Sequence, residues 1–149
     1  MVNQAIATLY LNSNRASEAE PYLKALVGNA ADPLSRLVLA DYYLMSKRQG
    51  DARPILDSIA ATKQGFAAAR LRLASLDFEA EDKTQAHEGI DQVLAREPKN
   101  VEALVLKGRF LAAEGRIDEA LTLAQSAVAA GPQAPAAHFL AGRLYSASR

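Results

Sequence analysis

Two arginines have the residue type and the spacing that could do chemistry in this chain. Arg109 and Arg143 are 34 residues apart, so a repeat of that length would place them at equivalent points on neighbouring elements. Two guanidinium groups held side by side could bind a carboxylate or an acidic segment through paired hydrogen bonds. The alternative is that each arginine pairs with a nearby acid or stays solvated.

The other polar residues give little support for catalysis. His87 and His138 have no partner at the spacing of a metal site or of a catalytic base, and His138 falls where a core residue is expected. The glycines form no phosphate-binding loop, and the acids of residues 77–82 lack the ligand spacing and the central glycine of a calcium loop. We therefore predict that the chain is not an enzyme and has no catalytic residues, no metal site and no cofactor.

Composition excludes several classes of protein. The 149 residues contain 17 Lys and Arg against 17 Asp and Glu, and this zero net charge argues against nucleic-acid binding. The absence of cysteine excludes disulfides and thiolate sites. It does not indicate a compartment, because a chain without thiols suits both oxidising and reducing surroundings. No apolar run approaches the roughly 18 residues of a membrane-spanning helix, and the N-terminal residues do not resemble a signal peptide. We expect a soluble protein, and the cytoplasm and the periplasm both stay open as its location.

The elements that would carry these residues are helices. Alanine and leucine, both strong helix formers, dominate the chain, while Val, Ile and Thr are too scattered to form alternating strands. Apolar residues at helical spacing predict an all-α fold with nine helices. We expect them at about residues 2–12, 17–27, 33–47, 52–61, 66–80, 84–95, 101–114, 118–130 and 135–147.

Local signals mark several helix ends. Asp32 and Asn100 stand where N-cap residues are expected, and Gly115 can adopt the left-handed conformation that ends a helix. Ser17 and Glu20 have the spacing of a capping box, so we expect them to start the helix at residue 17.

A 34-residue pattern runs through the chain and is clearest in residues 101–132. The unit contains Val101, Leu104, Gly108, Leu111, Gly115, Ala120, Ala124, Ala127 and Pro132, and equivalent residues recur one period upstream and one downstream. Small residues fall where two helices must touch, and these are Ala40, Ala74, Ala86, Gly108, Ala120 and Gly142.

The period and the two-helix unit resemble the tetratricopeptide repeat. The resemblance implies a right-handed α–α superhelix, or solenoid, of about four helix pairs plus a C-terminal helix. The whole chain, 1–149, would be one array with repeats at about 1–32, 33–66, 67–100 and 101–134 and a closing helix at 135–147. Its alanine- and leucine-rich texture resembles bacterial arrays of this family.

Some residues depart from the family pattern. The chain has no tryptophan, and the usual aromatic position holds Arg36, Arg70, Leu104 and His138. Lys107 stands where leucine is usual, and we expect its stem to follow the core while its amine stays in water.

In the repeat frame the first helix would begin at or before residue 1, so we expect the chain to be a fragment of a longer protein.

The family resemblance also implies a binding face. The first helix of each pair lines a concave groove that usually holds a peptide or a helix of a partner protein. By frame, the groove residues are Leu37, Asp41, Leu44, Leu71, Ser75, Phe78, Val105, Arg109, Phe139 and Arg143. By the same frame, Ala112 is a further residue of the groove. The clamp positions of the family's chaperone-binding members hold Asp41, Ser75 and Arg109 here, so that specificity is not carried over.

The apolar members of this set would form an exposed strip, which usually marks a binding site. The alternative is that Leu37, Leu44 and Phe78 are covered by a tight superhelical curve, by further repeats or by a second copy. Tyr42, Tyr43 and Met45 are expected in the core rather than in a ligand cage.

Three hypotheses for function follow. The first is a protein–protein interaction scaffold that binds a peptide or helix of a partner in the concave groove. The second is a structural module that self-associates into a homo-oligomer. The third is an RNA-binding helical repeat, against which the neutral charge argues.

Overall fold

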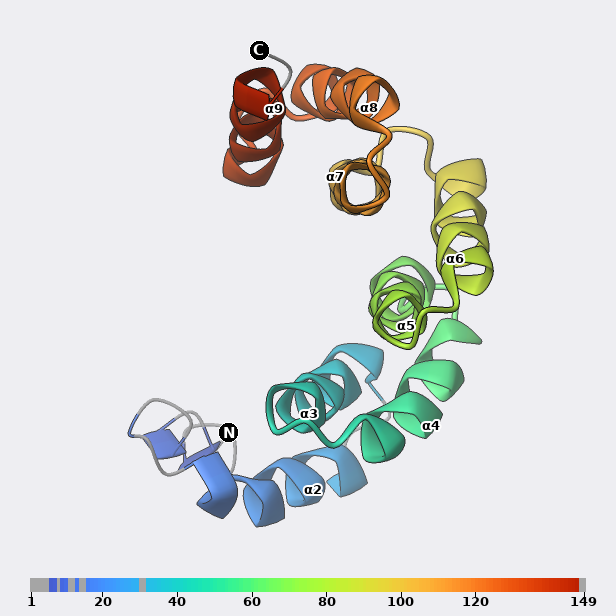
Figure 1. Ribbon diagram of the computed structural model, residues 1–149. Helices are drawn as coiled ribbons and strands as arrows, with labels where there is room; N and C mark the ends of the chain where they lie inside the picture. The colour runs from blue at the N-terminus through green and yellow to red at the C-terminus, as the bar shows by residue number, and fades with distance from the viewer. Residues whose placement is uncertain (1–5, 8, 11–12, 14–15, 30–31, 148–149) are drawn as a thin grey trace. The chain divides into compact units, whose positions relative to one another are not determined.

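The chain folds as a series of helices (Figure 1). The computed structural model describes residues 6–7, 9–10, 13, 16–29 and 32–147, and every regular element in these ranges is helical. The elements are η1 (Ala16–Glu18), α2 (Glu20–Asn29), α3 (Pro33–Met45), α4 (Gln49–Ala60), α5 (Phe66–Glu79), α6 (Lys83–Arg96), α7 (Val101–Ala113), α8 (Ile117–Ala130) and α9 (Pro135–Ala147). The prediction of an all-α chain is confirmed. Of the helix expected at 2–12, residues 6–7 and 9–10 are helical and the remainder lies outside the described residues.

The chain divides into two compact units. The first unit is Met1–Ala69 and contains α2, α3 and α4, while the second is Arg70–Arg149 and contains α6 to α9. Helix α5 begins with the last four residues of the first unit and continues into the second. The single array with four repeat boundaries therefore stays a prediction.

Helix starts follow the 34-residue frame closely. The first helices of the pairs begin at Pro33, Phe66, Val101 and Pro135. Asp32 Oδ2 accepts a hydrogen bond from the backbone N–H of Ser35 at 3.1 Å, and Asn100 Oδ1 accepts one from that of Ala103 at 3.0 Å. Both predicted N-caps are confirmed. In each, the side-chain oxygen satisfies a backbone N–H that the first helical turn leaves without a partner.

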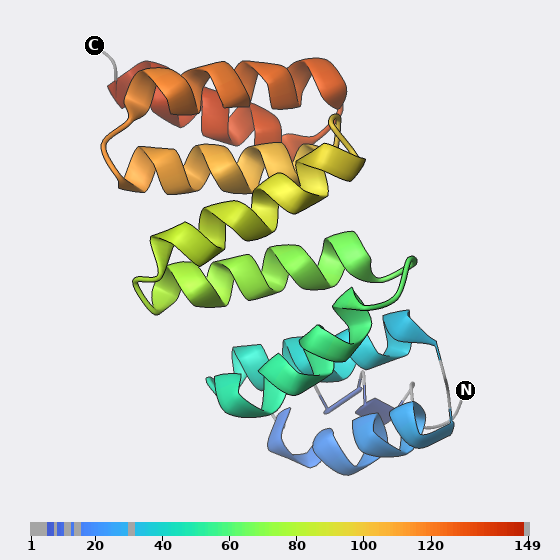
Figure 2. The same ribbon diagram turned by 90° about the vertical axis from the view of Figure 1, so that its right-hand side faces the viewer.

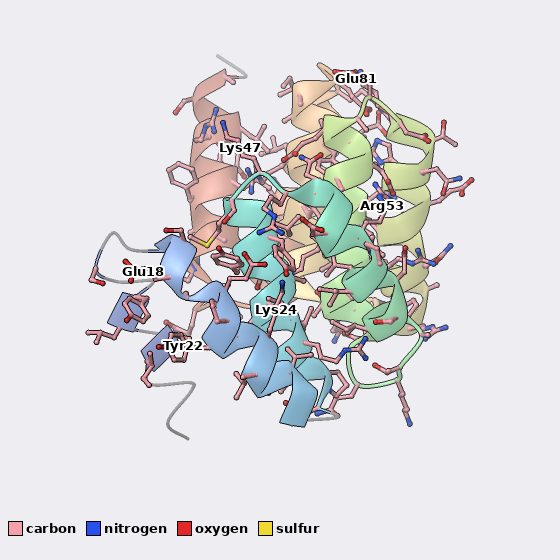
Figure 3. The ribbon with its side chains drawn as sticks, turned by 90° about the horizontal axis from the view of Figure 1, so that it is seen from below. Glu18, Tyr22, Lys24, Lys47, Arg53 and Glu81 are labelled. Carbon is pink, nitrogen blue, oxygen red and sulfur yellow. The ribbon has the colours of Figure 1, made fainter. Side chains whose placement is uncertain are left out.

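The capping box predicted at Ser17 and Glu20 is wrong. A 3₁₀ turn covers Ala16–Glu18, and α2 starts at Glu20 itself. The Glu20 carboxylate faces α3 and the residue before α4 instead: it accepts hydrogen bonds from Arg48 Nη1 at 2.7 Å and from the Tyr43 hydroxyl at 3.1 Å. Lys24 Nζ, labelled on α2 in Figure 3, lies 2.8 Å from the same carboxylate. Three side-chain donors thus compete with the capping role.

The turn inside each helix pair repeats with the 34-residue period. Lys47, Glu81 and Gly115 have backbone φ angles of 57°, 63° and 80°, which lie in the left-handed region. Lys47 and Glu81 are labelled in Figure 3 at the turns that follow α3 and α5. In each turn the backbone N–H of the following residue donates a hydrogen bond to the carbonyl five residues before it. These bonds run from Arg48 to Tyr43 at 2.8 Å, from Asp82 to Asp77 at 2.9 Å and from Arg116 to Leu111 at 2.9 Å. The three turns are the same helix-closing motif, and only the third has the glycine that it prefers.

Helix packing depends on small residues, as the sequence predicts. Ala40, Ala74, Ala86 and Ala120 are fully buried. In the second unit, α7, α8 and α9 lie side by side (Figure 2) and share an apolar core. This core contains Leu104, Val105, Leu111, Ala120, Ala124, Ala127, Ala137, Leu140 and Leu144.

The two predicted contact glycines differ. A Cβ atom on Gly108 would lie 2.9 Å from Leu140 Cδ2, the end of a leucine side chain on α9, so Gly108 lies in the contact between α7 and α9. A Cβ atom on Gly142 would have no neighbour within 4 Å in the described structure, so the expected helix contact at Gly142 is wrong.

Replacement of Lys47 by glycine should stabilise the first unit. Lys47 is exposed and has a left-handed backbone conformation. This conformation is unfavourable for any residue that has a Cβ atom. We expect Lys47→Gly to raise the free energy of unfolding by about 0.5–1 kcal/mol, measured by urea denaturation, once the entropy of glycine is subtracted. Lys47→Ala is the matched control, because it removes the same charge and keeps the strain. An equal gain in both variants would show that the lysine charge, and not the backbone, is responsible.

The Glu20 cluster should make stability depend on pH. Hydrogen bonds from Lys24 and then from Arg48 lower the pKa of Glu20 from 4.5 to about 2. Because the folded-state pKa is depressed, this stabilisation is complete above pH 4.5 and is lost as the pH falls from 4.5 towards 2. The free energy of unfolding of Glu20→Gln should therefore fall less across this window than that of the wild type. Glu88→Gln, at an exposed position on α6, is the control, and identical pH profiles for wild type and Glu20→Gln would contradict the assignment.

Candidate functional site

Two hollows lie on the first helices of the second unit. The α5–α7 hollow has a volume of about 490 Å³. It is lined by Leu71, Arg72, Ser75, Val101, Glu102, Val105, Leu106, Arg109 and Ala136. The α7–α9 hollow has a volume of about 400 Å³. It is lined by Arg109, Ala112, Ala113, Ile117, Leu140, Arg143, Leu144 and Ala147.

Arg109 is the residue that the two hollows share. It is exposed and makes no hydrogen bond or ion pair with the residues that the structure describes. Arg143 lines the α7–α9 hollow with it, and its guanidinium carbon lies 5.9 Å from the centre of the Phe139 ring. The structure therefore brings the two predicted arginines to one hollow.

Three other predicted residues lie in the α5–α7 hollow, but not as an exposed strip. Leu71 and Val105 are buried and form its floor, so the expectation that they face solvent is wrong for both. The Ser75 hydroxyl donates to the carbonyl of Leu71 at 3.1 Å. Leu71 and Val105 therefore expose only a small part of their surface to the hollow, and Ser75 is half-buried.

Phe78 and Phe139 have opposite environments. Phe78 is half-buried and its ring stacks on that of Phe110 with centres 4.0 Å apart and planes 10° apart, so it supports packing between α5 and α7 rather than a free groove surface. Phe139 is 67% exposed. Of the two predicted aromatic groove residues, only Phe139 presents its side chain to solvent.

The predicted groove residues of the first unit are less exposed than expected. Leu37 is buried, which contradicts its assignment to a solvent-facing strip, and Asp41 and Leu44 are half-buried. The apolar side chains of α3 that do face solvent are Leu34, Val38 and Met45.

Sequence reasoning missed Val38 and Met45 because it assigned the groove to Leu37 and Leu44, each one residue earlier. The 34-residue frame contained the signal: Val38, Arg72 and Leu106 are equivalent, and the last two line the α5–α7 hollow. Tyr42 and Tyr43 are buried as predicted, whereas Met45 is exposed and its assignment to the core is wrong.

The histidines also differ from expectation. His87 has a partner: its Nε2 atom lies 2.9 Å from Glu114 Oε1, across the α6–α7 contact. Its ring meets that of Phe110 edge-on with centres 6.1 Å apart. His138 is exposed and not a core residue, with Nε2 2.8 Å from the carbonyl of Pro132. Within the described ranges no group of three or more His, Cys, Asp or Glu side chains could hold a metal ion.

A third hollow, of about 570 Å³, lies among α6, α7 and α8 near His87. Its charged residues are paired. Lys107 binds Asp91, and Arg116 donates two hydrogen bonds to the Glu119 carboxylate at 2.7 and 2.6 Å. The Lys107 side chain is partly exposed, and its amine pairs with the exposed carboxylate of Asp91. Because its charges satisfy one another, this hollow has the chemistry of a structural ion-pair cluster.

One face of α9 is uncovered compared with the same face of α7. Val105 and Leu111 are 8% and 3% exposed, while their equivalents Phe139 and Tyr145 are 67% and 49% exposed. An open hollow of about 600 Å³ lies on this face. It includes His138, Phe139, Gly142, Arg143, Ser146 and Ala147. Among the residues that the structure describes, the type of surface that α8 and α9 cover on α7 is thus exposed on α9.

Comparisons with known proteins identify the repeat. The sequence pattern of the family described as tetratricopeptide repeat matches residues 5–68, 71–135 and 113–145. No curated protein matches the chain at a significant level. The helices described in the structure are each too short or too polar to cross a membrane.

Solved structures share the fold. MamA from Desulfovibrio magneticus RS-1 is 18% identical with a TM-score of 0.68, over 99% of this chain and 84% of its own. A double mutant of MamA from RS-1 is 17% identical with the same TM-score of 0.68, over 99% and 83%. YrrB, described as a tetratricopeptide repeat protein with an unusual peptide-binding site, is 19% identical with a TM-score of 0.58, over 98% and 76%. At these identities the likeness shows the fold alone, and it confirms the predicted helical-repeat class.

Proposed function

The chain belongs to the tetratricopeptide repeat family, a fold of protein–protein interaction scaffolds, and we propose that its second unit binds a segment of a partner protein in the α5–α7 and α7–α9 hollows. The bound segment would be a peptide or a helix. Proteins of this family are generally non-catalytic, and we propose the same of this chain.

The observation that carries the proposal is the junction of the two hollows at Arg109. Each hollow has a volume within the range of ligand sites, about 300–1,000 Å³, at 490 and 400 Å³. Since both share one exposed arginine, a single extended or helical segment can contact both.

The lining of the hollows supports a polypeptide ligand. Apolar side chains form most of the walls, including Val101, Leu106, Ile117 and Leu144, and only a few charged groups stand among them. A mainly apolar surface with a central arginine is typical of the energetically dominant part of a protein interface. YrrB, whose description names a peptide-binding site, has a similar fold.

Crosslinking at Ala136 tests the proposed face. Ala136 is an exposed wall residue of the α5–α7 hollow, and Ala129 is an exposed residue of α8 that lines neither hollow. A photoreactive amino acid at position 136 should crosslink one partner in source-cell lysate, and the same group at position 129 should not.

Calorimetry with that purified partner should then show at least about tenfold weaker binding to Ala136→Glu, because the new carboxylate must lose water in an apolar contact. Ala129→Glu should change the affinity less than about twofold. Equal crosslinking from both positions, or unchanged affinity of Ala136→Glu, would place the partner elsewhere and contradict the proposal.

The uncovered face of α9 favours a second candidate function, self-association. Phe139 and Tyr145 expose the side of the helix that is covered on α7 within the same chain. An exposed pair of aromatic residues beside a glycine is suited to a second copy, since the bare backbone permits close helix approach.

Self-association through α9 predicts a mass that rises with concentration. Light scattering over a wide concentration range should show this rise for the wild type, and Phe139→Ser should reduce it. Met45→Ser, which removes an exposed apolar side chain from α3, should leave it unchanged. A monomeric mass at all concentrations would eliminate this second candidate.

A further inference from the structure

We infer that two copies of the chain associate through α9 alone, with the two helices antiparallel and related by a two-fold axis at Gly142. The inference rests on the second candidate function, self-association, and adds the surface that the second copy supplies and the register of the contact. In this arrangement the Phe139 ring of each copy lies level with Tyr145 of the other. Each α9 takes the place on its partner that α8 has on α7.

Five exposed residues of α9 lie on one side of the helix and are called the α9 stripe. At about 100° per residue, they fall within about 120° of one another around the helix axis. Leu140 and Leu144 are buried on the opposite side, in the core shared with α7 and α8, which lie on one side of α9 in Figure 1. The α9 stripe consists of His138, Phe139, Gly142, Tyr145 and Ser146.

The contact between α7 and α8 shows which kind of helix covers such a stripe. Gly108 is the equivalent of Gly142 on α7, and a Cβ atom there would lie 3.4 Å from the carbonyl oxygen of Ala120 on α8. Because a short turn joins α7 to α8, the two helices run antiparallel (Figure 2). A Cβ atom on Gly142 would have no neighbour within 4 Å in the described structure. The equivalent position on α9 is therefore open to an antiparallel helix.

A second α9 has the small residues that the covering helix needs. In α8, Ala120 and Ala124 are fully buried in the core shared with α7 and α9, four positions apart. Gly142 and Ser146 have the same spacing within the α9 stripe. The stripe thus combines a glycine that can receive a helix with the small residues of a helix that can be received. Two copies of α9 can fill both roles for each other.

The register follows from the aromatic residues on either side of Gly142. Phe139 lies three residues before the glycine and Tyr145 three residues after it. When antiparallel helices cross at Gly142, position 139 of one copy is level with position 145 of the other, so two aromatic contacts form. Tyr145 is oriented before association, because its hydroxyl accepts a hydrogen bond from Gln125 Nε2 at 2.8 Å.

Electrostatics permit the pairing. The α9 stripe contains no Asp, Glu, Lys or Arg, so two copies bring no such charges face to face. Arg143 lies at the border of the stripe, with its guanidinium carbon 5.9 Å from the centre of the Phe139 ring. Antiparallel helices also set the positive end of each helix dipole beside the negative end of the other.

The size of the contact predicts a weak dimer. Helix α9 has 13 residues, and a helix of that length is about 20 Å long. One face of such a helix covers less than the roughly 800 Å² per partner of a standard interface, and smaller interfaces belong to weak complexes. We therefore expect the dimer to form at high micromolar concentration and to dissociate at low micromolar concentration.

Substitution of Gly142 separates the dimer contact from the fold. A Cβ atom at Gly142 meets no atom of the described chain within 4 Å, so Gly142→Gln should fold, which thermal melts would verify. In the dimer the new side chain lies where the two helices are closest. Sedimentation equilibrium should therefore show a dimer dissociation constant at least about tenfold higher than that of the wild type.

Gly50→Gln is the matched control for this substitution. Gly50 is an exposed helical glycine on α4, and a Cβ atom there also has no neighbour within 4 Å. Its dissociation constant should stay within about twofold of the wild-type value. An unchanged dissociation constant for Gly142→Gln would overturn the inference.

Crosslinking tests the register, because the chain contains no cysteine of its own. Positions 138 and 146 lie four residues before and after Gly142, so antiparallel copies place them level, whereas like positions are about 12 Å apart along the axis. His138→Cys and Ser146→Cys chains of different mass would be mixed under mild oxidation. The mixed disulfide should exceed either homodimer at least about tenfold, since disulfides require closely spaced Cβ atoms. Ala129→Cys, on the exposed side of α8, would replace Ser146→Cys to give the background.

The outcomes distinguish this register from self-association in general. An excess of like-with-like disulfides would indicate a parallel pair, and a mixed disulfide at the background level would place the contact elsewhere. Either result overturns the inference and leaves self-association intact where the wild-type mass still rises with concentration. A wild-type mass that stays monomeric would remove the second candidate function together with the inference.

Discussion

The packing of one helix pair against the next is the constraint on which the rest of the structure depends. A single pair cannot bury its apolar faces, so it is stable only where a neighbour covers them. Gly108 lies in such a contact: a Cβ atom there would lie 2.9 Å from Leu140 Cδ2 and 3.4 Å from the carbonyl oxygen of Ala120. This packing sets the rotation of α7 about its axis, with Gly108 on the side that faces α8 and α9.

This rotation decides which side chains are left for function. Arg109 follows Gly108 directly, so it projects about 100° further round the helix, beside the contact and not within it. Val105 lies nearer the contact and forms the floor of the α5–α7 hollow, while Arg109 reaches the border of both hollows. Core and candidate site are therefore adjacent faces of the same helices, and a substitution on one face can leave the other unchanged.

Much of the fold could be predicted because its determinants are local. The 34-residue period and caps such as Asp32 depend on residues a few positions apart, and the structure confirms them. The exposed residues within each helix could not be predicted as well: Leu37 and Val38 are both apolar, and only the position of the neighbouring helix makes the first buried and the second exposed. The His87–Glu114 contact joins residues 27 positions apart, and no helical spacing indicates it.

The arginines show that local sequence nevertheless indicates which side chains form ion pairs. Arg48 and Arg116 each precede a helix and have an acid three residues later, so that the pair forms across the first turn. Arg109 and Arg143 lie inside helices, and the residues three and four positions away on either side are apolar or small, with serine the one polar member. An arginine of the first kind is occupied as soon as its helix forms. An arginine of the second kind depends on tertiary neighbours for a partner, and at Arg109 the described neighbours offer hollows with apolar walls and no ion pair. The same residue type thus pairs across the first turn of a helix in one setting and has no ion pair among the described residues in the other.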